Sequence, residues 1–207
     1  MILRAIAVGM NQTNCYIVGC EQTRRGVVID PGDEGKRIVQ HTERDDLQVE
    51  YVLLTHAHFD HIGGVAEVVA ATGAQLAIHP KERPLLEARG GASLWGLDVE
   101  ASPPLDVELS AGQTLEVGTL TFQVLFTPGH SPGGVTFYLA DQAVAFVGDL
   151  LFSRGVGRTD LPGGDQATLM HSIKEVVFAL PDDTVVYPGH GPKTTVGQEK
   201  RANPWIR

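Results

Sequence analysis

The stretch Thr55-His56-Ala57-His58-Phe59-Asp60-His61-Ile62-Gly63-Gly64 carries the strongest signal in this chain. It places three imidazoles and one carboxylate within six positions, and divalent ions such as zinc bind these donors. His56 and His58 stand two residues apart in an extended loop, so their side chains can point the same way. Asp60 and His61 fall on the turn that follows. One segment can therefore supply donors to two adjacent metal ions.

The flanking residues place this segment between a strand and a helix. The apolar run from Tyr51 to Thr55 predicts a short strand that leads straight into His56. Beyond the segment, apolar residues recur at helical spacing from Ile62 to Thr72, and Gly73 is expected to end that helix. The last two donors are therefore expected at the start of a helix.

The rest of the first half alternates short strands with helices. Residues 34–44 have a helical composition, and residues 81–89 predict a short helix. The β-rich segments predict an antiparallel opening sheet and one later strand. These segments are Ile2 to Val8, Cys15 to Val18, Gly26 to Asp30 and Gln75 to His79.

Three more metal donors stand in the second half, and each follows a predicted strand and a glycine. They are His130 in Thr127-Pro128-Gly129-His130-Ser131, Asp149 in Val147-Gly148-Asp149, and His190 in Tyr187-Pro188-Gly189-His190-Gly191. Glycine lets the backbone turn tightly at a strand end, so donors from several loops can converge on one edge of a sheet. The shared placement predicts one cleft.

The second half repeats the architecture of the first. Its predicted strands are residues 120–127, 135–139, 143–147 and 184–187, and its predicted helix covers residues 166–180. Alternation of strand groups and helices predicts an α/β fold of stacked sheets covered by helices. A chain of 207 residues is short enough for a single domain, so one domain is expected over residues 1–207. Residues 90–104 predict an ordered surface loop or flap within it.

Composition narrows the function. The formal net charge of −9, without a dense basic run, disfavours a nucleic-acid partner. No stretch approaches the roughly 20 apolar residues that span a bilayer, so no membrane association is expected. The N-terminus lacks a basic region followed by an apolar run, which favours a cytoplasmic protein. Cys15 and Cys20 are expected to stay reduced and buried.

The donor types favour a catalytic metal site. A structural zinc site prefers a closed, cysteine-rich shell, and the sequence has no Cys-x-x-Cys pair. Histidine and aspartate donors favour an open site with room for water and substrate. His41, His79 and His171 lack motif partners, and we interpret them as structural or exposed.

The block His-x-His-x-Asp-His, followed by isolated His, Asp and His after strands, resembles the metallo-β-lactamase superfamily. The resemblance spans nearly the whole chain and implies a four-layer αββα sandwich of two mixed β-sheets flanked by helices. It also implies a site for two divalent metal ions, zinc first, with iron or manganese as the alternatives. The ligands carried over are His56, His58 and His130 for the first ion, Asp60, His61 and His190 for the second, and Asp149 as the bridge.

Within the superfamily the chain most resembles the glyoxalase II-like hydrolases. The matching motifs are Gln12-Thr13-Asn14-Cys15-Tyr16, Asp30-Pro31-Gly32 and Gly157-Arg158-Thr159-Asp160. The resemblance implies a thioesterase that cleaves a small acyl-thioester such as S-lactoylglutathione by means of a metal-bridging hydroxide, which Asp60 also orients. The aspartate in Gly148-Asp149 and the missing export signal argue against a β-lactamase.

The chain departs from full-length glyoxalase II at its end. It stops 17 residues after His190, so it lacks the C-terminal helical region that grips glutathione. The basic residues left near the end are interpreted as a solvated tail, with substrate contact as the alternative. They are Lys193, Lys200, Arg201 and Arg207.

Other functions remain open from the sequence. Persulfide dioxygenases resemble the chain in the histidine block and in residues 154–160, and they hold a single iron. His56, His130 and Asp149 would suit Fe(II) as a two-His-one-carboxylate face. A non-catalytic binding module on the same fold is a further alternative, because a fold alone does not establish an activity. A flavodiiron protein fits less well, since that family resembles His-x-Glu-x-Asp and His58 stands at the glutamate position.

Overall fold

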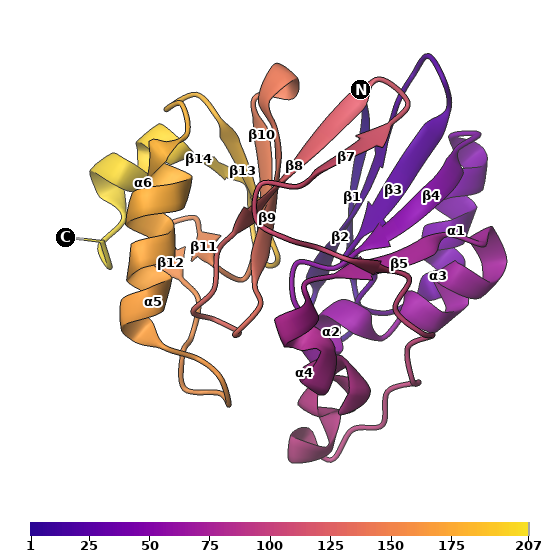
Figure 1. The fold of residues 1–207 in the computed structure, drawn as a ribbon, viewed down its shortest axis with the longest axis horizontal. Coiled ribbons are helices and arrows are strands. Elements are labelled where there is room, and N and C mark those ends of the chain that lie inside the picture. The colour runs from indigo at the N-terminus through magenta and orange to yellow at the C-terminus, as the bar shows by residue number, and fades with distance from the viewer. Residues whose placement is uncertain (207) are drawn as a thin grey trace. The chain divides into compact units, whose positions relative to one another are not determined.

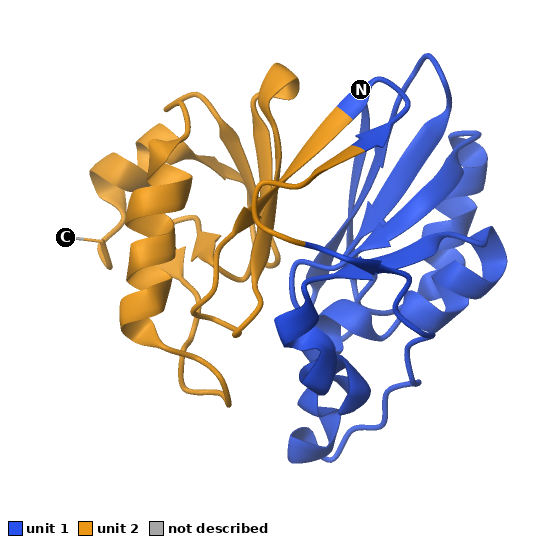
Figure 2. Cartoon of the chain, in the orientation of Figure 1, with its two compact units in different colours: residues 1–109, 116–120 blue, residues 110–115, 121–207 orange. Residues whose placement is uncertain are grey.

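The chain forms two six-stranded mixed sheets (Figure 1) and divides into two compact units (Figure 2). The first sheet lies within unit 1, and the second lies in unit 2 except for residues 116–120. The structure is a computed structural model that describes residues 1–206. Unit 1 comprises Met1–Leu109 and Glu116–Leu120, and unit 2 comprises Ser110–Leu115 and the chain from Thr121 onward. Within the described residues, no helix has the length and apolar character needed to cross a bilayer.

The sheet of unit 1 has the strand order β1-β2-β3-β4-β5-β6. The first three strands are antiparallel, as predicted, and the pairings from β3 to β6 are parallel. Parallel neighbours need crossover connections, and each of the three crossovers between β3 and β6 contains helical segments. The strands are β1 (Ile2–Val8), β2 (Thr13–Gly19), β3 (Arg25–Ile29), β4 (Gln48–Leu53), β5 (Gln75–Ile78) and β6 (Val107–Glu108).

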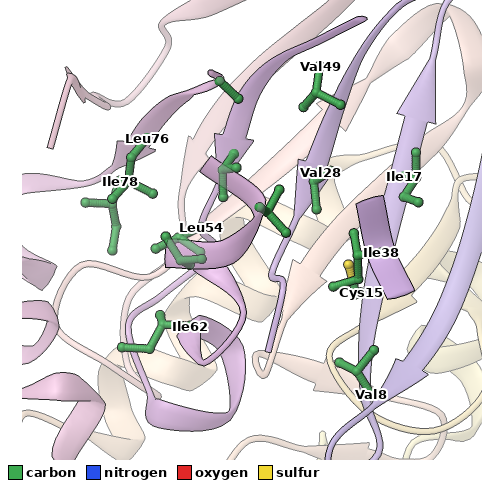
Figure 3. Packing of buried hydrophobic residues seen from close by; sticks show 14 of the residues in the cluster. Val8, Cys15, Ile17, Val28, Ile38, Val49, Leu54, Ile62, Leu76 and Ile78 are labelled. Carbon is green, nitrogen blue, oxygen red and sulfur yellow. The ribbon is translucent and has the colours of Figure 1, made fainter. Parts of the chain in front are cut away.

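The core of unit 1 forms where α1 (Gly35–Arg44) and α3 (Val65–Thr72) cover one face of this sheet (Figure 1). Ile38 of α1 packs in the same cluster as Ile17 and Val28 of the strands, all with no exposed surface (Figure 3). Cys15 lies in this cluster, and burial raises the pKa of its thiol. Cys15 and Cys20 are both buried and free of a disulfide, as expected.

The second sheet has the order β14-β13-β10-β9-β8-β7. The pairing of β10 with β13 is parallel, whereas β13–β14, β10–β9 and β9–β8 are antiparallel. Helices α5 (Gln166–His171) and α6 (Val196–Ala202) lie over one face (Figure 1) and pack through Leu169 and Val196. The strands are β7 (Thr114–Val117), β8 (Leu120–Phe126), β9 (Val135–Leu139), β10 (Val144–Gly148), β13 (Val185–Pro188) and β14 (Thr194–Thr195).

Two predicted helices are broken in the structure. The expected helix from Ile62 to Thr72 is preceded by a separate short helix, α2 (Phe59–Ile62), and α3 begins after Gly63 and Gly64. A side chain on Gly63 would meet the carbonyl of Gly32 at 2.4 Å, so glycine is needed for this close approach. The expected helix over 166–180 changes to a π-helical turn at Ser172–Val176 and a 3-10 turn at Val177–Ala179.

Several short elements were not predicted. The hairpin β11 (Leu151–Phe152) and β12 (Gly155–Val156), together with β6, β7 and β14, is too short or too polar to give a periodic signal. The segment Val196–Ala202 forms α6, on which Lys200 and Arg201 are exposed to solvent, as expected. The predicted flap begins as a 3-10 segment, Arg89–Trp95, and residues 81–89 divide between a 3-10 turn, Pro80–Glu82, and α4 (Arg83–Glu87).

Gly90 is the glycine on which the entry to α2 depends, and its replacement should be costly. Its φ is +67°, and an added Cβ would lie 2.2 Å from the Phe59 backbone nitrogen. We expect Gly90→Ala to lower the free energy of unfolding by about 2–4 kcal/mol, combining left-handed strain with overpacking. Urea denaturation of the purified variant measures this.

Gly73 provides the matched control, because its φ is +69° and nothing lies within 4 Å of its added Cβ. Gly73→Ala should therefore cost only the backbone strain, about 1 kcal/mol. Equal losses in the two variants would contradict the role given to the contact with Phe59.

Candidate metal centre

The four candidate donors of unit 1 lie between the end of β4 and the end of α2, as the sequence predicted. His56, His58 and His61 are buried, with 2%, 8% and 0% of their surface exposed, and Asp60 is half-buried. The ring centroid of His56 lies 4.8 Å from that of His58 and 4.1 Å from that of His61. The structure therefore brings the three imidazoles of the motif into one cluster.

A buried carboxylate, Asp30 at the end of β3, fixes two of these imidazoles. Its Oδ2 lies 3.0 Å from Nδ1 of His61 and accepts a hydrogen bond from the Thr55 hydroxyl at 2.6 Å. The same hydroxyl lies 3.0 Å from Nδ1 of His56. Because the Thr55 hydroxyl donates its hydrogen bond to Asp30, its oxygen is left to accept a hydrogen bond from His56. Both rings then carry their proton on Nδ1 and present the lone pair of Nε2.

Asp60 is oriented by the turn between β1 and β2. Its Oδ2 accepts hydrogen bonds from Asn11 Nδ2 at 3.0 Å and from Thr13 Oγ1 at 3.3 Å. The backbone beside it is also fixed, because a side chain on Gly32 would lie 1.8 Å from the Asp60 carbonyl oxygen. Within unit 1, Asp60 is therefore held from two sides, by β1–β2 and by the loop after Asp30.

Glu82 supports the histidine loop from a distant part of unit 1. Its side chain has no exposed surface, and its Oε2 accepts a hydrogen bond from the backbone nitrogen of Ala57 at 2.9 Å. Ala57 stands between His56 and His58, so this bond fixes the backbone between two candidate donors. No motif in the sequence marked Glu82, because a single glutamate in a helical segment has the ordinary pattern of a surface residue.

The three candidate donors of unit 2 also meet. Oδ2 of Asp149 lies 3.7 Å from Nε2 of His130 and 3.5 Å from Nε2 of His190. Each of these residues follows a strand of the second sheet, namely β8, β10 and β13. One carboxylate oxygen is thus within reach of two imidazoles, which is the arrangement expected of a bridging ligand.

His130 is oriented by the segment that follows Asp149. Its Nδ1 lies 2.8 Å from the carbonyl oxygen of Arg158, which can only accept a hydrogen bond, so Nδ1 carries the proton. Gly157 makes this approach feasible, since a Cβ there would lie 1.9 Å from the Asp149 carbonyl oxygen. The Nε2 lone pair of His130 consequently faces Asp149.

The hairpin before Gly157 is itself anchored by a buried network on α6. Glu199 has no exposed surface, and its Oε2 accepts from the Arg154 backbone nitrogen at 2.9 Å and from Asn203 Nδ2 at 2.8 Å. Its Oε1 accepts from the Thr194 hydroxyl at 2.6 Å. The chain between β11 and β12 is therefore fixed to the last helix.

The donor chemistry of both clusters fits a divalent metal. In proteins, a ligating imidazole donates its other N–H to a carboxylate, a carbonyl or a hydroxyl, which fixes the tautomer and raises its basicity. His61, His130 and His56 meet this condition through Asp30, Arg158 and Thr55. Asp30 is one of the groups that hold the candidate ligands in place. The sequence did not predict it as part of the site, although its Asp-Pro-Gly motif matches the family.

Arg158 forms a two-bond ion pair with Asp160 at 2.7 and 2.8 Å, and this pairing lowers the pKa of Asp160 to about 2. The described basic residues considered as substrate contacts also have partners within unit 2. Lys200 and Arg201 lie 2.6 and 3.8 Å from the carboxylate of Asp182, and Lys193 lies over the ring of Tyr187. Arg207 lies outside the described residues.

The fold and these two clusters define an α/β protein with the donor set of a metal-dependent hydrolase. The pattern of the Metallo-beta-lactamase superfamily matches residues 8–190, which is most of the chain. The chain belongs to the metallo-β-lactamase superfamily. The predicted fold class, two mixed β-sheets with helices, is confirmed.

Curated relatives share the full length of the chain. A probable metallo-hydrolase of Bacillus subtilis, YqgX, is 40% identical over 98% of this chain and 96% of its own. The hydroxyacylglutathione hydrolase GloC of Haemophilus influenzae is 37% identical over 100% and 98%. The mitochondrial persulfide dioxygenase ETHE1 of Mus musculus is 33% identical over 99% of this chain and 75% of its own.

Two solved structures are similar over nearly the whole chain. One is described as the B3 metallo-beta-lactamase BLEG-1, with a TM-score of 0.93 and 41% identity over 99% of both chains. The other is TTHA1623 in a di-iron-bound form, with a TM-score of 0.90 and 43% identity over 98% of this chain and 100% of that one. Relatives with hydrolase and dioxygenase names are thus similar at comparable identity.

Asp30→Asn should weaken metal binding while the protein stays folded. The amide keeps the size of the side chain but loses the negative charge of the carboxylate, which accepts hydrogen bonds from Thr55 and His61. We expect the affinity for zinc to fall by about tenfold to a hundredfold, as for other groups that support metal-ligating histidines. Competition with a chromophoric chelator measures the affinity.

Asp46→Asn is the matched control. Asp46 is exposed, and like Asp30 it has a left-handed backbone, with φ values of 52° and 49°. Its zinc affinity should equal that of the wild type. An unchanged affinity in Asp30→Asn would contradict the supporting role given to Asp30.

Proposed function

We propose that the chain is a thioester hydrolase in which the two clusters form a single two-metal centre. The proposal treats residues 1–207 as a single domain. It is supported by the match of the superfamily pattern, which runs through both units. The ligands are His56, His58 and His130 for the first ion, Asp60, His61 and His190 for the second, and Asp149 for both.

The observation that carries this proposal is the position of Asp149 between two imidazoles. Its Oδ2 lies at similar distances from His130 and His190, 3.7 and 3.5 Å. The proposed assignment gives those histidines to different ions, so a shared carboxylate oxygen is what a bridge requires. A centre with one ion would need His130 and Asp149 but would leave His190 without a ligand role.

The proposed substrate is a small acyl-thioester such as S-lactoylglutathione. Support comes from GloC, a hydroxyacylglutathione hydrolase by name, which matches the whole chain. When bound, a pair of divalent ions makes an ionised water available near neutral pH and stabilises negative charge on a carbonyl oxygen. Zinc is the proposed metal, with iron or manganese as alternatives, since TTHA1623 is described in a di-iron-bound form.

The chain's own residues would orient the reaction. Asn11 and Thr13 hold the Asp60 carboxylate through Oδ2, and the held carboxylate would bind the second ion and orient the attacking water. Asp30 keeps the proton of His61 on Nδ1, and Thr55 keeps the proton of His56 on Nδ1, so that both rings would hold their tautomer during the reaction. A cytoplasmic location is also proposed, which the two free buried cysteines support.

The second candidate is a persulfide dioxygenase with one iron. It is supported by the identity to ETHE1 and by the segment from Arg154 to Asp160 that resembles that family. Its metal would use His56, His130 and Asp149 only. The two candidates therefore differ in the number of ions and in their need for His61 and His190.

Metal content and two assays separate these candidates. We expect about two zinc or iron ions per chain by elemental analysis and release of free thiol from S-lactoylglutathione, because a bridged centre serves hydrolysis. One iron per chain with glutathione-persulfide-dependent oxygen uptake would support the dioxygenase instead. Neither activity in metal-replete protein would favour a binding module.

Asp60→Asn tests the proposed role of Asp60. An amide has one oxygen where the carboxylate has two, so it cannot both accept the bonds from Asn11 and Thr13 and supply a second oxygen to the proposed centre. Turnover of the thioester should therefore fall by about tenfold to a hundredfold. Retention of the first ion is expected, because its proposed ligands are untouched. Asp46→Asn, an exposed site, should keep wild-type turnover, and wild-type turnover in Asp60→Asn would end the assignment.

A further inference from the structure

A pocket of about 260 Å³ lies within unit 1, beside the proposed reacting centre. It is bounded by the β1–β2 turn on one side and by residues 97–100 of the predicted flap on another, and Asp60 and Phe59 form part of its wall. Small-molecule sites usually measure about 300–1,000 Å³, so this pocket suits a small group and not a whole tripeptide thiol.

The wall of the pocket combines apolar and acidic side chains. The apolar ones are Val8, Met10, Phe59, Leu97 and Val99, and the acidic ones are Asp33, Asp60, Asp98 and Glu100. No Lys, Arg or His is among the described residues that line it. A carboxylate entering this pocket would meet like charges and no cation, which disfavours its binding.

Two of the four carboxylates contribute little net negative charge to the pocket. Asp98 is neutralised by its ion pair with Arg89 at 2.6 Å. Arg37, which does not line the pocket, is itself paired with Glu34 at 2.8 Å. Asp60 would be neutralised by the metal it is proposed to bind. The side chains that remain to attract a cation are Asp33 and Glu100.

We infer that this pocket is the subsite for a small, partly apolar group that carries a positive charge. An alkyl portion would lie against Met10 and Leu97, and the aromatic ring of Phe59 in the same wall is available for a cation–π contact. The inference rests on the proposed function, because Asp60 is the residue that connects the pocket with the reacting centre. It assigns to this chain a preference for thioesters that place a cationic group in this pocket.

Methyl NMR of Met10 tests occupancy without any reaction. The chain has three methionines, and Met10 is 76% exposed, so its labelled methyl group is a direct probe, with Met1 and Met170 as internal references. In the metal-loaded protein, choline should shift the Met10 signal, and its neutral isostere 3,3-dimethylbutan-1-ol should do so only at about fivefold higher concentration. Equal titrations for both probes, or no shift with either, would overturn the inference.

The double variant Asp33→Asn/Glu100→Gln tests the source of the preference. Both residues are exposed, so their effect is modest and screened by salt. The double variant should lose the roughly fivefold preference for choline and keep the affinity for the neutral alcohol. Asp141→Asn, an exposed site in unit 2, should keep the preference. A preference that survives in the double variant would contradict the role of these carboxylates.

Hydrolysis gives a second readout that separates the two proposals. Acetylthiocholine and S-(3,3-dimethylbutyl) thioacetate differ only in charge, and kcat/KM should favour the cation by about fivefold in the wild type and not in the double variant. Hydrolysis of both at equal rates, with no shift of Met10, would overturn the subsite and leave the thioesterase standing. No hydrolysis of either, with the Met10 shift intact, would overturn the thioesterase and leave the pocket as a cation site.

Discussion

The buried carboxylate of Asp30 is the constraint on which the arrangement of unit 1 depends. A buried charge is costly unless donors surround it, and Asp30, 2% exposed, receives the Thr55 backbone N–H, the Thr55 hydroxyl and the Nδ1 proton of His61. These bonds join the end of β3 to the end of β4 and to α2. The hydrogen bonds that stabilise the buried charge of Asp30 therefore also fix the orientation of His61 and, through Thr55, of His56.

The sequence was a good guide wherever a donor or a strand has its own local pattern. The histidine block, the Gly-His and Gly-Asp turns and most longer strands were located within a few residues. The roles of Asp30 and Glu82 were not predicted, because their hydrogen-bond partners Thr55, His61 and Ala57 lie 25 or more residues away in the sequence. The β11–β12 hairpin was not predicted, because a two-residue strand is too short to show an alternation of apolar and polar residues. The meeting of the two donor sets in one centre stays a prediction.

Membership of a superfamily does not by itself choose a reaction, and the relatives illustrate this. A hydrolase and a dioxygenase are similar to the chain at 37% and 33% identity. Selection between the two activities depends on whether Asp149 is shared by two ions and on which groups enter the pocket beside Asp60. Those features belong to this chain's own side chains more than to the fold.

The network around Glu199 makes the end of the chain part of the machinery that holds His130. Glu199 of α6 holds the Arg154 backbone by a hydrogen bond, and a short stretch of chain joins Arg154 to Arg158, whose carbonyl is bound by His130. A disturbance of α6 can therefore reach an imidazole through two hydrogen bonds. Purification tags and fusion partners are therefore better attached at Met1, which precedes β1 in the other unit. For the same reason, a longer homologue that adds a domain after this helix has a direct mechanical connection through which that domain could tune its metal site.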